Sequence, residues 1–220
     1  MSQADELIAA IRAGDAARVQ ELLDADPSLA AASANNTSVL LVAMYMGQPE
    51  IARAIAAKRD ALTFHEACAL GDVDRVRQMV AADPSVLHRY SDDGFAPFGF
   101  ATFFGHDEVD RFLIDSGADI HAQATNPQRV GAIHAAAAVR NHAMLKLLLE
   151  RGVDPNARQQ MDYTPMHTAA ARGDMEMARL LLAHGAQRDA RGSDGKTPAD
   201  VARDHGHATF AEWIASNETA

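Results

Sequence analysis

Histidine first raises the question of chemistry in this chain, because it is present ten times and commonly binds metals or transfers protons near neutral pH. His205 and His207 stand two residues apart, so on a helix they point in different directions. No cysteine or carboxylate pair completes a zinc set around them. His65, His134 and His167 instead occupy the same position of a recurring motif. We therefore expect structural histidines, with no metal and no cofactor.

The other reactive residue types give little support to catalysis. The segment 192–197 has glycine and lysine before threonine, but it lacks the spacing of a phosphate-binding loop. The acidic residues of the segment 106–108 fit a helix N-terminus, where carboxylates meet the helix dipole. Cys68, the single cysteine, stands beside Ala67 as a small buried residue would. We expect no enzyme, although residues from separate parts of the chain could still form a pocket.

The histidine motif returns at a fixed spacing. The segment Thr164-Pro165-Met166-His167 has equivalents 33 residues downstream and 33 residues upstream, starting at positions 197 and 131. Toward the N-terminus, equivalent segments start at positions 96, 62, 38 and 5. A period near 33 with a Thr-Pro-Leu-His-x-Ala core resembles the ankyrin repeat family, over about residues 5–216.

One unit of the repeat explains the pattern physically. Thr164 can accept a backbone N–H bond as a helix cap, and Pro165 suits the first helical position. Ala169 and Ala170 keep the helix thin, and Gly173 permits the left-handed conformation that ends it. The segment 175–182 then predicts a second, apolar helix. Neither helix can bury its apolar side alone, so stability must come from stacking each pair on the next.

The pattern predicts an all-α fold, an ankyrin-repeat solenoid of about seven stacked helix-turn-helix units with short projecting turns. Only 24 residues separate the starts at 38 and 62, which predicts a shortened link between two helices there. Phe210, Trp213 and Ile214 recur at helical spacing and are expected to close the core. We expect one domain, residues 1–220, with approximate repeats 5–37, 38–61, 62–95, 96–130, 131–163, 164–196 and 197–216.

Composition narrows the classes of partner and compartment. The formal net charge of −10 argues against nucleic acid and against an anionic membrane surface. No apolar run approaches the roughly 18 residues of a membrane helix, and the N-terminus opens with Asp5 and Glu6 instead of a targeting signal. A single cysteine fits a reducing compartment. We expect a cytoplasmic protein that is monomeric on its own.

The resemblance also implies where a partner binds. In ankyrin repeats the residues just before the helix-ending turn lie on the concave surface, and the residue before Thr-Pro lies in the projecting turn. These positions hold mostly apolar and aromatic side chains here, namely Tyr45, Met46, Leu70, Phe103, Phe104 and Val139, with Arg172, and with Phe95 and Tyr163 from the turns.

Phenylalanine is concentrated in one stretch, with six of eight between positions 95 and 112. We expect Phe98, Phe100 and Phe112 to fill the core, and Phe103 and Phe104 to point toward the groove. Gly99 replaces the motif histidine and is expected to make room for a neighbouring ring.

These expectations favour a non-enzymatic module for protein–protein interaction, which binds a partner protein or peptide, of unknown identity, in a concave, partly aromatic groove. One alternative is a small-molecule-binding protein or enzyme, with a pocket lined by the Phe95–Phe104 cluster and polar groups such as Asp92, Asp93 or Arg129. Another is a passive structural or regulatory subunit encoded beside an enzyme.

Overall fold

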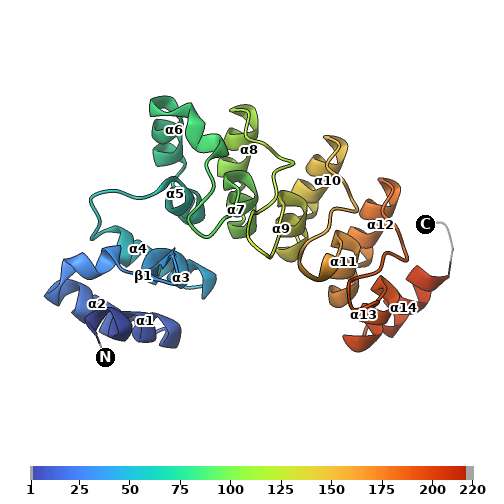
Figure 1. Cartoon of the computed structure of the whole chain (residues 1–220), viewed down its shortest axis with the longest axis horizontal. Helices are drawn as coiled ribbons and strands as arrows, with labels where there is room; N and C mark the ends of the chain where they lie inside the picture. Colours follow the sequence, from blue (N-terminus) through green and yellow to red (C-terminus); the bar gives the residue numbers. More distant parts are fainter. Residues whose placement is uncertain (1, 217–220) are drawn as a thin grey trace.

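Helix pairs make up most of the computed structural model, which describes residues 2–216. Fourteen α-helices form seven consecutive pairs in this part of the chain (Figure 1), so the predicted all-α solenoid is confirmed. The pairs are α1 (Gln3–Ala13) with α2 (Ala16–Ala25), α3 (Val39–Tyr45) with α4 (Pro49–Ala56), α5 (Phe64–Leu70) with α6 (Val73–Ala82), α7 (Pro97–Phe104) with α8 (Asp107–Asp115), α9 (Ala132–Ala138) with α10 (His142–Glu150), α11 (Pro165–Arg172) with α12 (Met175–Ala183), and α13 (Pro198–Asp204) with α14 (Ala208–Ala215).

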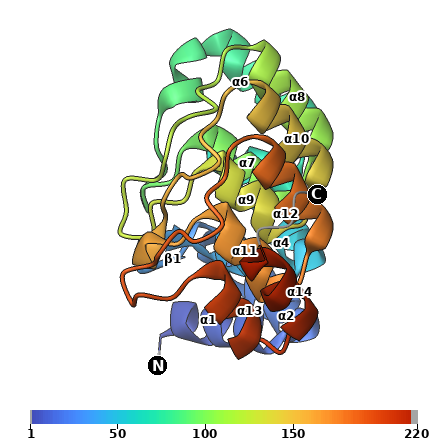
Figure 2. The same ribbon diagram turned by 90° about the vertical axis from the view of Figure 1, so that its right-hand side faces the viewer.

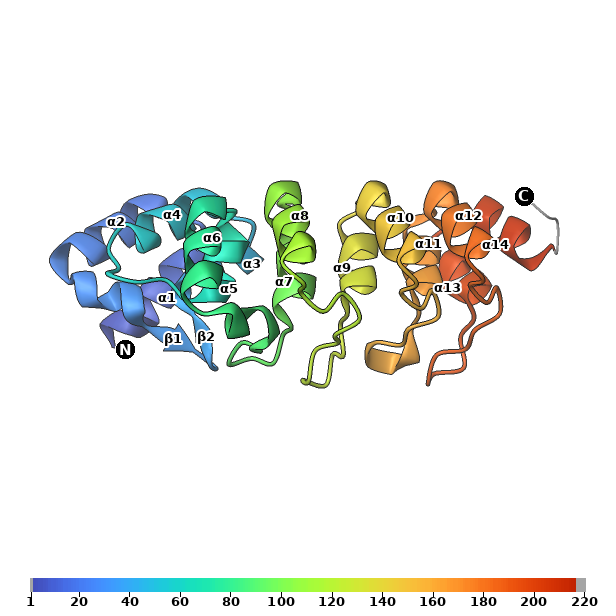
Figure 3. The same ribbon diagram turned by 90° about the horizontal axis from the view of Figure 1, so that it is seen from above.

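The pairs stack into an arc with two helical layers. Each first helix of a pair packs against the first helices of its neighbours, from α1 to α13. These first helices line the inner side of the arc, and α6, α8, α10 and α12 lie outside them (Figure 1). The loops between pairs project to one side of the molecule (Figures 2 and 3). The inner helices and the projecting loops therefore form two walls of a groove.

Local capping explains where the helices begin and end. The Thr63 hydroxyl accepts a hydrogen bond from the Glu66 N–H at 3.2 Å, and the Glu66 carboxylate accepts one from the Thr63 N–H at 2.7 Å. The two bonds make a reciprocal capping box. Gly173 ends α11 at φ 61°, as predicted. Thr164 differs from the prediction, because its N–H donates to His167 Nδ1 at 3.1 Å and its hydroxyl lies 3.0 Å from the same nitrogen.

The link between α4 and α5 is short, as its spacing predicted. The chain crosses in residues 57–63, without a projecting hairpin. Arg59 pairs here with Glu66, whose side chain is buried in α5.

Two kinds of short element were not predicted. Strands β1 (Ser33–Ala34) and β2 (Thr37–Ser38) pair antiparallel around Asn35 and Asn36, which have φ angles of 50° and 65°. Asparagine tolerates this left-handed region better than most residues and therefore suits a tight hairpin. The 3-10 helix η1 (Pro27–Ala31) precedes β1 in the same loop, and η2 (Pro84–His88) and η3 (Gln160–Asp162) lie in later loops.

The buried side chains divide into two clusters. The N-terminal cluster comes from α1 to α4 and adds only Ala69 of α5 and Phe100 of α7, while the C-terminal cluster extends from α5 to α14. Phe98 is 1% exposed and Phe100 is also buried, as predicted. Phe112 is only partly buried, and the Arg77 guanidinium lies 5.6 Å from its ring centre. Phe112 thus packs against the C-terminal cluster but is not fully buried, so its prediction as a core residue is met only in part.

Gly99 has a different role from the predicted one. A Cβ atom at this position would lie 3.3 Å from the backbone nitrogen of Ala132 and 3.5 Å from the carbonyl carbon of Gly131. The glycine therefore lets the backbones of α7 and α9 approach each other closely, and it does not make room for a ring.

The C-terminal helix covers the end of the described solenoid. Phe210 and Ile214 are buried in the C-terminal cluster, as predicted. Trp213 is partly buried, and the guanidinium groups of Arg179 and Arg188 lie 5.6 and 5.7 Å from its ring centre. Among residues 2–216, no helix is both long and apolar enough to cross a membrane.

Candidate binding groove

A pocket of about 510 Å³ lies between the inner helices and the projecting loops. We call it the central pocket. It is lined mainly by aromatic and small apolar side chains, and three carboxamides are among its polar groups. The lining consists of Tyr45, Phe95, Gly99, Phe100, Phe103, Gln128, Val130, His134, Ala135, Ala138, Gln159, Gln160, Met161 and Tyr163.

Aromatic rings form one wall of the central pocket. The Tyr45 ring centre lies 6.2 Å from that of Phe100 and 6.3 Å from that of Phe103, and Phe95 lies 5.8 Å from Phe100. Phe103 is 40% exposed although it belongs to the last turn of α7, a helix of the inner layer. An exposed ring beside the rings of Tyr45 and Phe104 is apolar surface available to a ligand.

Phe104 lies differently from Phe103. Its ring is half-buried and packs 5.2 Å from Phe100 and 5.7 Å from Tyr45, at the edge of the N-terminal cluster. It is absent from the lining of the central pocket. Adjacent positions on a helix point about 100° apart, so only one of the two neighbouring rings faces this pocket.

The other predicted residues divide between the pocket and its surroundings. Met46 and Val139 are exposed beside it, and neither lines it. Leu70 is half-buried against the N-terminal cluster. Tyr163 lines the central pocket, and Arg172 lines the next pocket along the groove.

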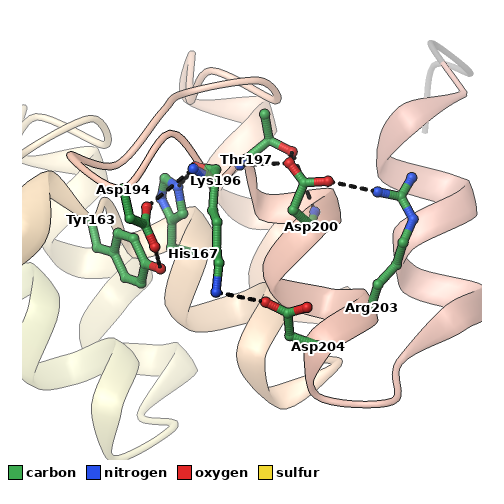
Figure 4. A network of polar contacts seen from close by, with 8 residues as sticks. All are labelled: Tyr163, His167, Asp194, Lys196, Thr197, Asp200, Arg203 and Asp204. Atoms are coloured by element: carbon green, nitrogen blue, oxygen red, sulfur yellow. Dashed lines mark hydrogen bonds and ion pairs between the residues drawn. The ribbon is translucent and has the colours of Figure 1, made fainter.

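That next pocket, the distal pocket, has a volume of about 280 Å³ and shares Tyr163 with the central one. Tyr163 stacks on His167 with ring centres 4.5 Å apart, and its hydroxyl donates to Asp194 at 2.9 Å (Figure 4). Burial, and after it the bond to Asp194, raises the pKa of Tyr163. The lining is Tyr163, His167, Thr168, Ala171, Arg172, Lys196, Val201, Asp204 and His205.

A third pocket, the proximal pocket, adjoins the other side of the central pocket. Its volume is about 490 Å³, and it is lined by Thr37, Tyr45, Asp93, Phe95, Asn126, Pro127 and Gln128. It shares Tyr45, Phe95 and Gln128 with the central pocket. The three pockets together form one continuous groove that extends from β2 to α13.

The motif histidines hold the loop wall of the groove. Their Nε2 atoms lie within hydrogen-bond distance of carbonyl oxygens in the following loop, 3.2 Å for His65 to Phe95, 2.9 Å for His134 to Ala157 and 3.2 Å for His167 to Lys196. The Gly131 N–H donates to His134 Nδ1 at 3.1 Å, so that ring donates through Nε2. The predicted structural role is confirmed. Burial lowers the pKa of His134 to about 4.

Backbone hydrogen bonds connect successive loops directly. Thr125 N–H donates to Gly94 O, Gln160 N–H donates to Gln128 O, and Ser193 N–H donates to Met161 O, each at 2.8 Å. These bonds make the projecting loops one connected wall.

The sequence interpretation missed four loop residues that line the central pocket, namely Gln128, Gln159, Gln160 and Met161. Met161 and Asp162 have φ angles of 61° and 56°, and Arg129 has φ 50°; such left-handed residues other than glycine cost of order 1–3 kcal/mol each. Arg129 binds Asp162 at 2.8 Å and the Gln159 carbonyl at 3.0 Å. Met161 is 47% exposed. An apolar residue within a polar loop is the sequence signal that could have identified it.

A buried carboxyl group lies behind the inner layer. Asp110 of α8 is fully buried, and its Oδ2 has no hydrogen-bond partner among the described residues. Thr102 Oγ1 lies 3.0 Å from Phe98 O and 3.3 Å from Asp110 Oδ1. Thr102 has a single hydroxyl proton. If it donates this proton to the nearer Phe98 carbonyl, a hydrogen bond between Thr102 and Asp110 requires a protonated Asp110 carboxyl group as the donor. Burial and the nearby Asp107 raise the pKa of Asp110 to about 7.

The residues from 2 to 216 contain no group of three or more histidines, cysteines or carboxylates that could hold a metal ion. His106, at the start of α8 as predicted, places its Nε2 atom 2.8 Å from the Ala69 carbonyl of α5. Cys68 is buried, and burial raises the pKa of its thiol.

The stacked pairs and their groove define a helical-repeat scaffold. Residues 133–220 match a family model described as ankyrin repeats (3 copies). The human DNA-binding protein RFXANK (Homo sapiens) is 32% identical over 71 residues, 32% of this chain and 27% of that protein. The human Ankyrin repeat and KH domain-containing protein 1 is 32% identical over 108 residues, 49% of this chain and 4% of that protein. The C-terminal part of the chain thus consists of ankyrin repeats, and the matches span about a quarter or less of these relatives' lengths.

Proposed function

We propose that this protein is a non-enzymatic binding module that holds an extended segment of a partner protein in the groove. Ankyrin repeats are general modules of protein–protein interaction. The observation that carries the proposal is the exposed aromatic wall of the central pocket, continuous with a pocket on either side. Rigid aromatic anchors in a groove are common hot spots of binding energy.

The module is proposed to act as one domain, residues 1–220, in the cytosol and as a monomer before it meets its partner. The single cysteine supports a reducing compartment. One of the human relatives is named a DNA-binding protein. We do not extend DNA binding to this chain, because its net charge of −10 opposes contact with phosphates.

The alternative is a small-molecule-binding protein or enzyme that uses the central pocket. Its volume falls within the roughly 300–1,000 Å³ of ligand pockets. The charged groups proposed for such a site do not meet in this pocket, because Arg129 pairs with Asp162 and neither Asp92 nor Asp93 lines the pocket. The polar groups that do line it, chiefly Gln128, Gln159 and Gln160, favour neutral hydrogen bonds to a peptide backbone.

Affinity purification from the native cytosol tests the proposal. Wild-type protein is compared with Phe103→Ala and with the matched control Tyr90→Ala, since Tyr90 is 39% exposed and lines none of the three groove pockets. A stoichiometric protein partner that is retained by wild type and Tyr90→Ala and lost from Phe103→Ala is the expected result. Native mass spectrometry that finds a bound small molecule and no protein partner would favour the alternative.

A further inference from the structure

The groove differs in charge between its two ends. We propose that it recognises an extended peptide with a basic side chain at the proximal pocket, a bulky apolar side chain in the central pocket and a carboxylate at the distal pocket. This inference rests on the proposed function and names the chemistry of its partner. The carboxylate can belong to an acidic side chain or to a chain terminus, because both present the same group.

The proximal end has carboxylates without a basic partner. Asp93 lines the proximal pocket, and Asp92 is exposed beside it in the same loop. Asp93 accepts a hydrogen bond from Ser91 Oγ at 2.5 Å, and the Tyr45 hydroxyl lies 3.5 Å from its other oxygen. Within residues 2–216, neither aspartate forms a salt bridge. A lysine or arginine of a bound peptide would provide the missing positive charge.

The distal end has the opposite charge. Arg172 is exposed at the end of α11 and lines the distal pocket. The one carboxylate of that pocket belongs to Asp204, which pairs with Lys196 Nζ at 2.9 Å (Figure 4). No salt bridge to Arg172 forms within the described part of the chain. A guanidinium group binds a carboxylate through two parallel hydrogen bonds, so Arg172 is suited to an acidic group of the peptide.

The spacing of the two ends fits a short extended segment. The helices α7, α9 and α11 are successive neighbours in the inner layer, and helix axes pack about 8–10 Å apart. Two such steps cover about 20 Å. Arg172 stands at the far end of an eight-residue helix, which adds an offset of about 12 Å at 1.5 Å per residue. The two components combine to a distance of about 23 Å between the two charged ends of the groove, which corresponds to about seven residues of extended chain.

The middle of the groove supplies the remaining complementarity. The exposed Phe103 ring and the apolar lining of the central pocket suit one large apolar side chain, about halfway between the two charges. The carboxamides of Gln128, Gln159 and Gln160 at the pocket can both donate and accept hydrogen bonds. They therefore match the alternating N–H and C=O groups of an extended backbone.

Selection of peptides by charge-reversed variants tests this inference. A library of randomised 12-residue peptides with free carboxyl termini is displayed and selected on wild type, on Arg172→Glu and on Arg151→Glu. Arg151 is a matched control, because it is exposed at the end of α10 in the outer layer and lines none of the groove pockets. Circular dichroism melts confirm that each variant is folded.

Wild type and Arg151→Glu should enrich peptides with a lysine or arginine and a carboxylate about seven residues apart, around an apolar residue. Arg172→Glu should lose the carboxylate and enrich a second basic residue in its place. A synthetic peptide of the wild-type consensus should bind Arg172→Glu at least tenfold more weakly, and exchange of its acidic group for lysine should restore affinity. The consensus peptide is then compared with a free C-terminal carboxylate and with a C-terminal amide. This comparison shows whether the bound carboxylate belongs to the chain terminus or to an acidic side chain.

Two outcomes would overturn the inference in different ways. If all three proteins enrich the same apolar peptides without charge preference, and Phe103→Ala abolishes their binding, the groove binds peptides and the charge assignment fails. If no peptide is enriched on wild type above a surface without protein, both the charge assignment and peptide binding by the groove are rejected.

Discussion

Two phenylalanines on α7 differ in what surrounds their rings. Phe98 is 1% exposed in the C-terminal cluster, whereas Phe103 is 40% exposed at the central pocket. At the scale of single residues, burial therefore separates a side chain that stabilises the fold from one that is available for binding. Both residues belong to one eight-residue helix, but five positions separate them, so their side chains point in different directions.

This contrast predicts opposite effects of truncation. Phe103→Ala should lower the free energy of unfolding by about 1 kcal/mol or less and weaken partner binding roughly 30-fold, as loss of about 2 kcal/mol of hot-spot energy implies. Phe98→Ala should cost about 3–5 kcal/mol of stability. Urea unfolding and titration with the partner measure the two quantities. Equal destabilisation by both variants, with binding of the folded fraction unaltered, would assign both rings to the core.

Asp110 predicts how stability depends on pH. Its pKa of about 7 in the folded protein lies above the 3.8 of an ordinary aspartate, so folding favours the protonated form. The contribution is present in full below about pH 4 and is lost as the pH rises through about 7, with a total of about 4 kcal/mol. Asp107 and Cys68 are the nearby titratable groups.

The Asp110→Asn variant should remove this pH dependence, since the amide needs no proton. Denaturant unfolding of both proteins between pH 5 and pH 8 measures the difference in stability. The variant should gain stability relative to wild type as the pH rises. A constant difference over this range would show that the Asp110 pKa is not raised.

At the scale of elements, the histidines couple each inner helix to the next loop. Without the His134 ring, the Gly131 N–H and the Ala157 carbonyl both lose a partner, and a buried unsatisfied group costs about 1–3 kcal/mol. His134→Ala should therefore lower stability by a few kcal/mol near pH 7. His121→Ala, an exposed histidine on a loop, is the control and should change stability little.

Acidification should reduce the difference in stability between His134→Ala and wild type. The folded state holds the pKa of His134 near 4, below the ordinary 6.5, so the contribution of the neutral ring is present above about pH 6.5. It is lost as the pH falls toward 4, by about 3 kcal/mol. Thermal melts of wild type and His134→Ala at pH 7 and pH 4.5 measure it. A difference that stays the same at both pH values would contradict the lowered pKa of His134.

Much of this level of structure was predictable from the sequence. The helix pairs follow from the period and from local caps, since both depend on residues close in the chain. The histidine bonds follow from the register of the motif. Met161 and Gln160 were not found, because their positions depend on a bond between loops more than thirty residues apart. The close approach of Gly99 to Ala132 also depends on how closely two helices pack, and the repeat period of the sequence does not predict this distance.

At the scale of the whole molecule, each pair is stabilised by its neighbours, so the end of the array needs a cover. Phe210 and Ile214 bury their side chains in the C-terminal cluster. Truncation before Ala208 should expose the apolar surface that they cover and lower the melting temperature. Differential scanning calorimetry of both chains provides the measurement. A truncated chain that melts as the full chain does would reject a capping role for α14.

The two buried clusters have a consequence for how the molecule opens. Hydrogen exchange should resolve two cooperative units, one of α1 to α4 and one from α5 onward, because opening free energies follow contiguous cores. Tyr45 belongs to the first unit and Ala138 to the second, yet both line the central pocket. An occupant of that pocket would therefore connect two units that otherwise open separately, and amide protons far from the groove, on α1 and α2, should exchange more slowly once it is bound.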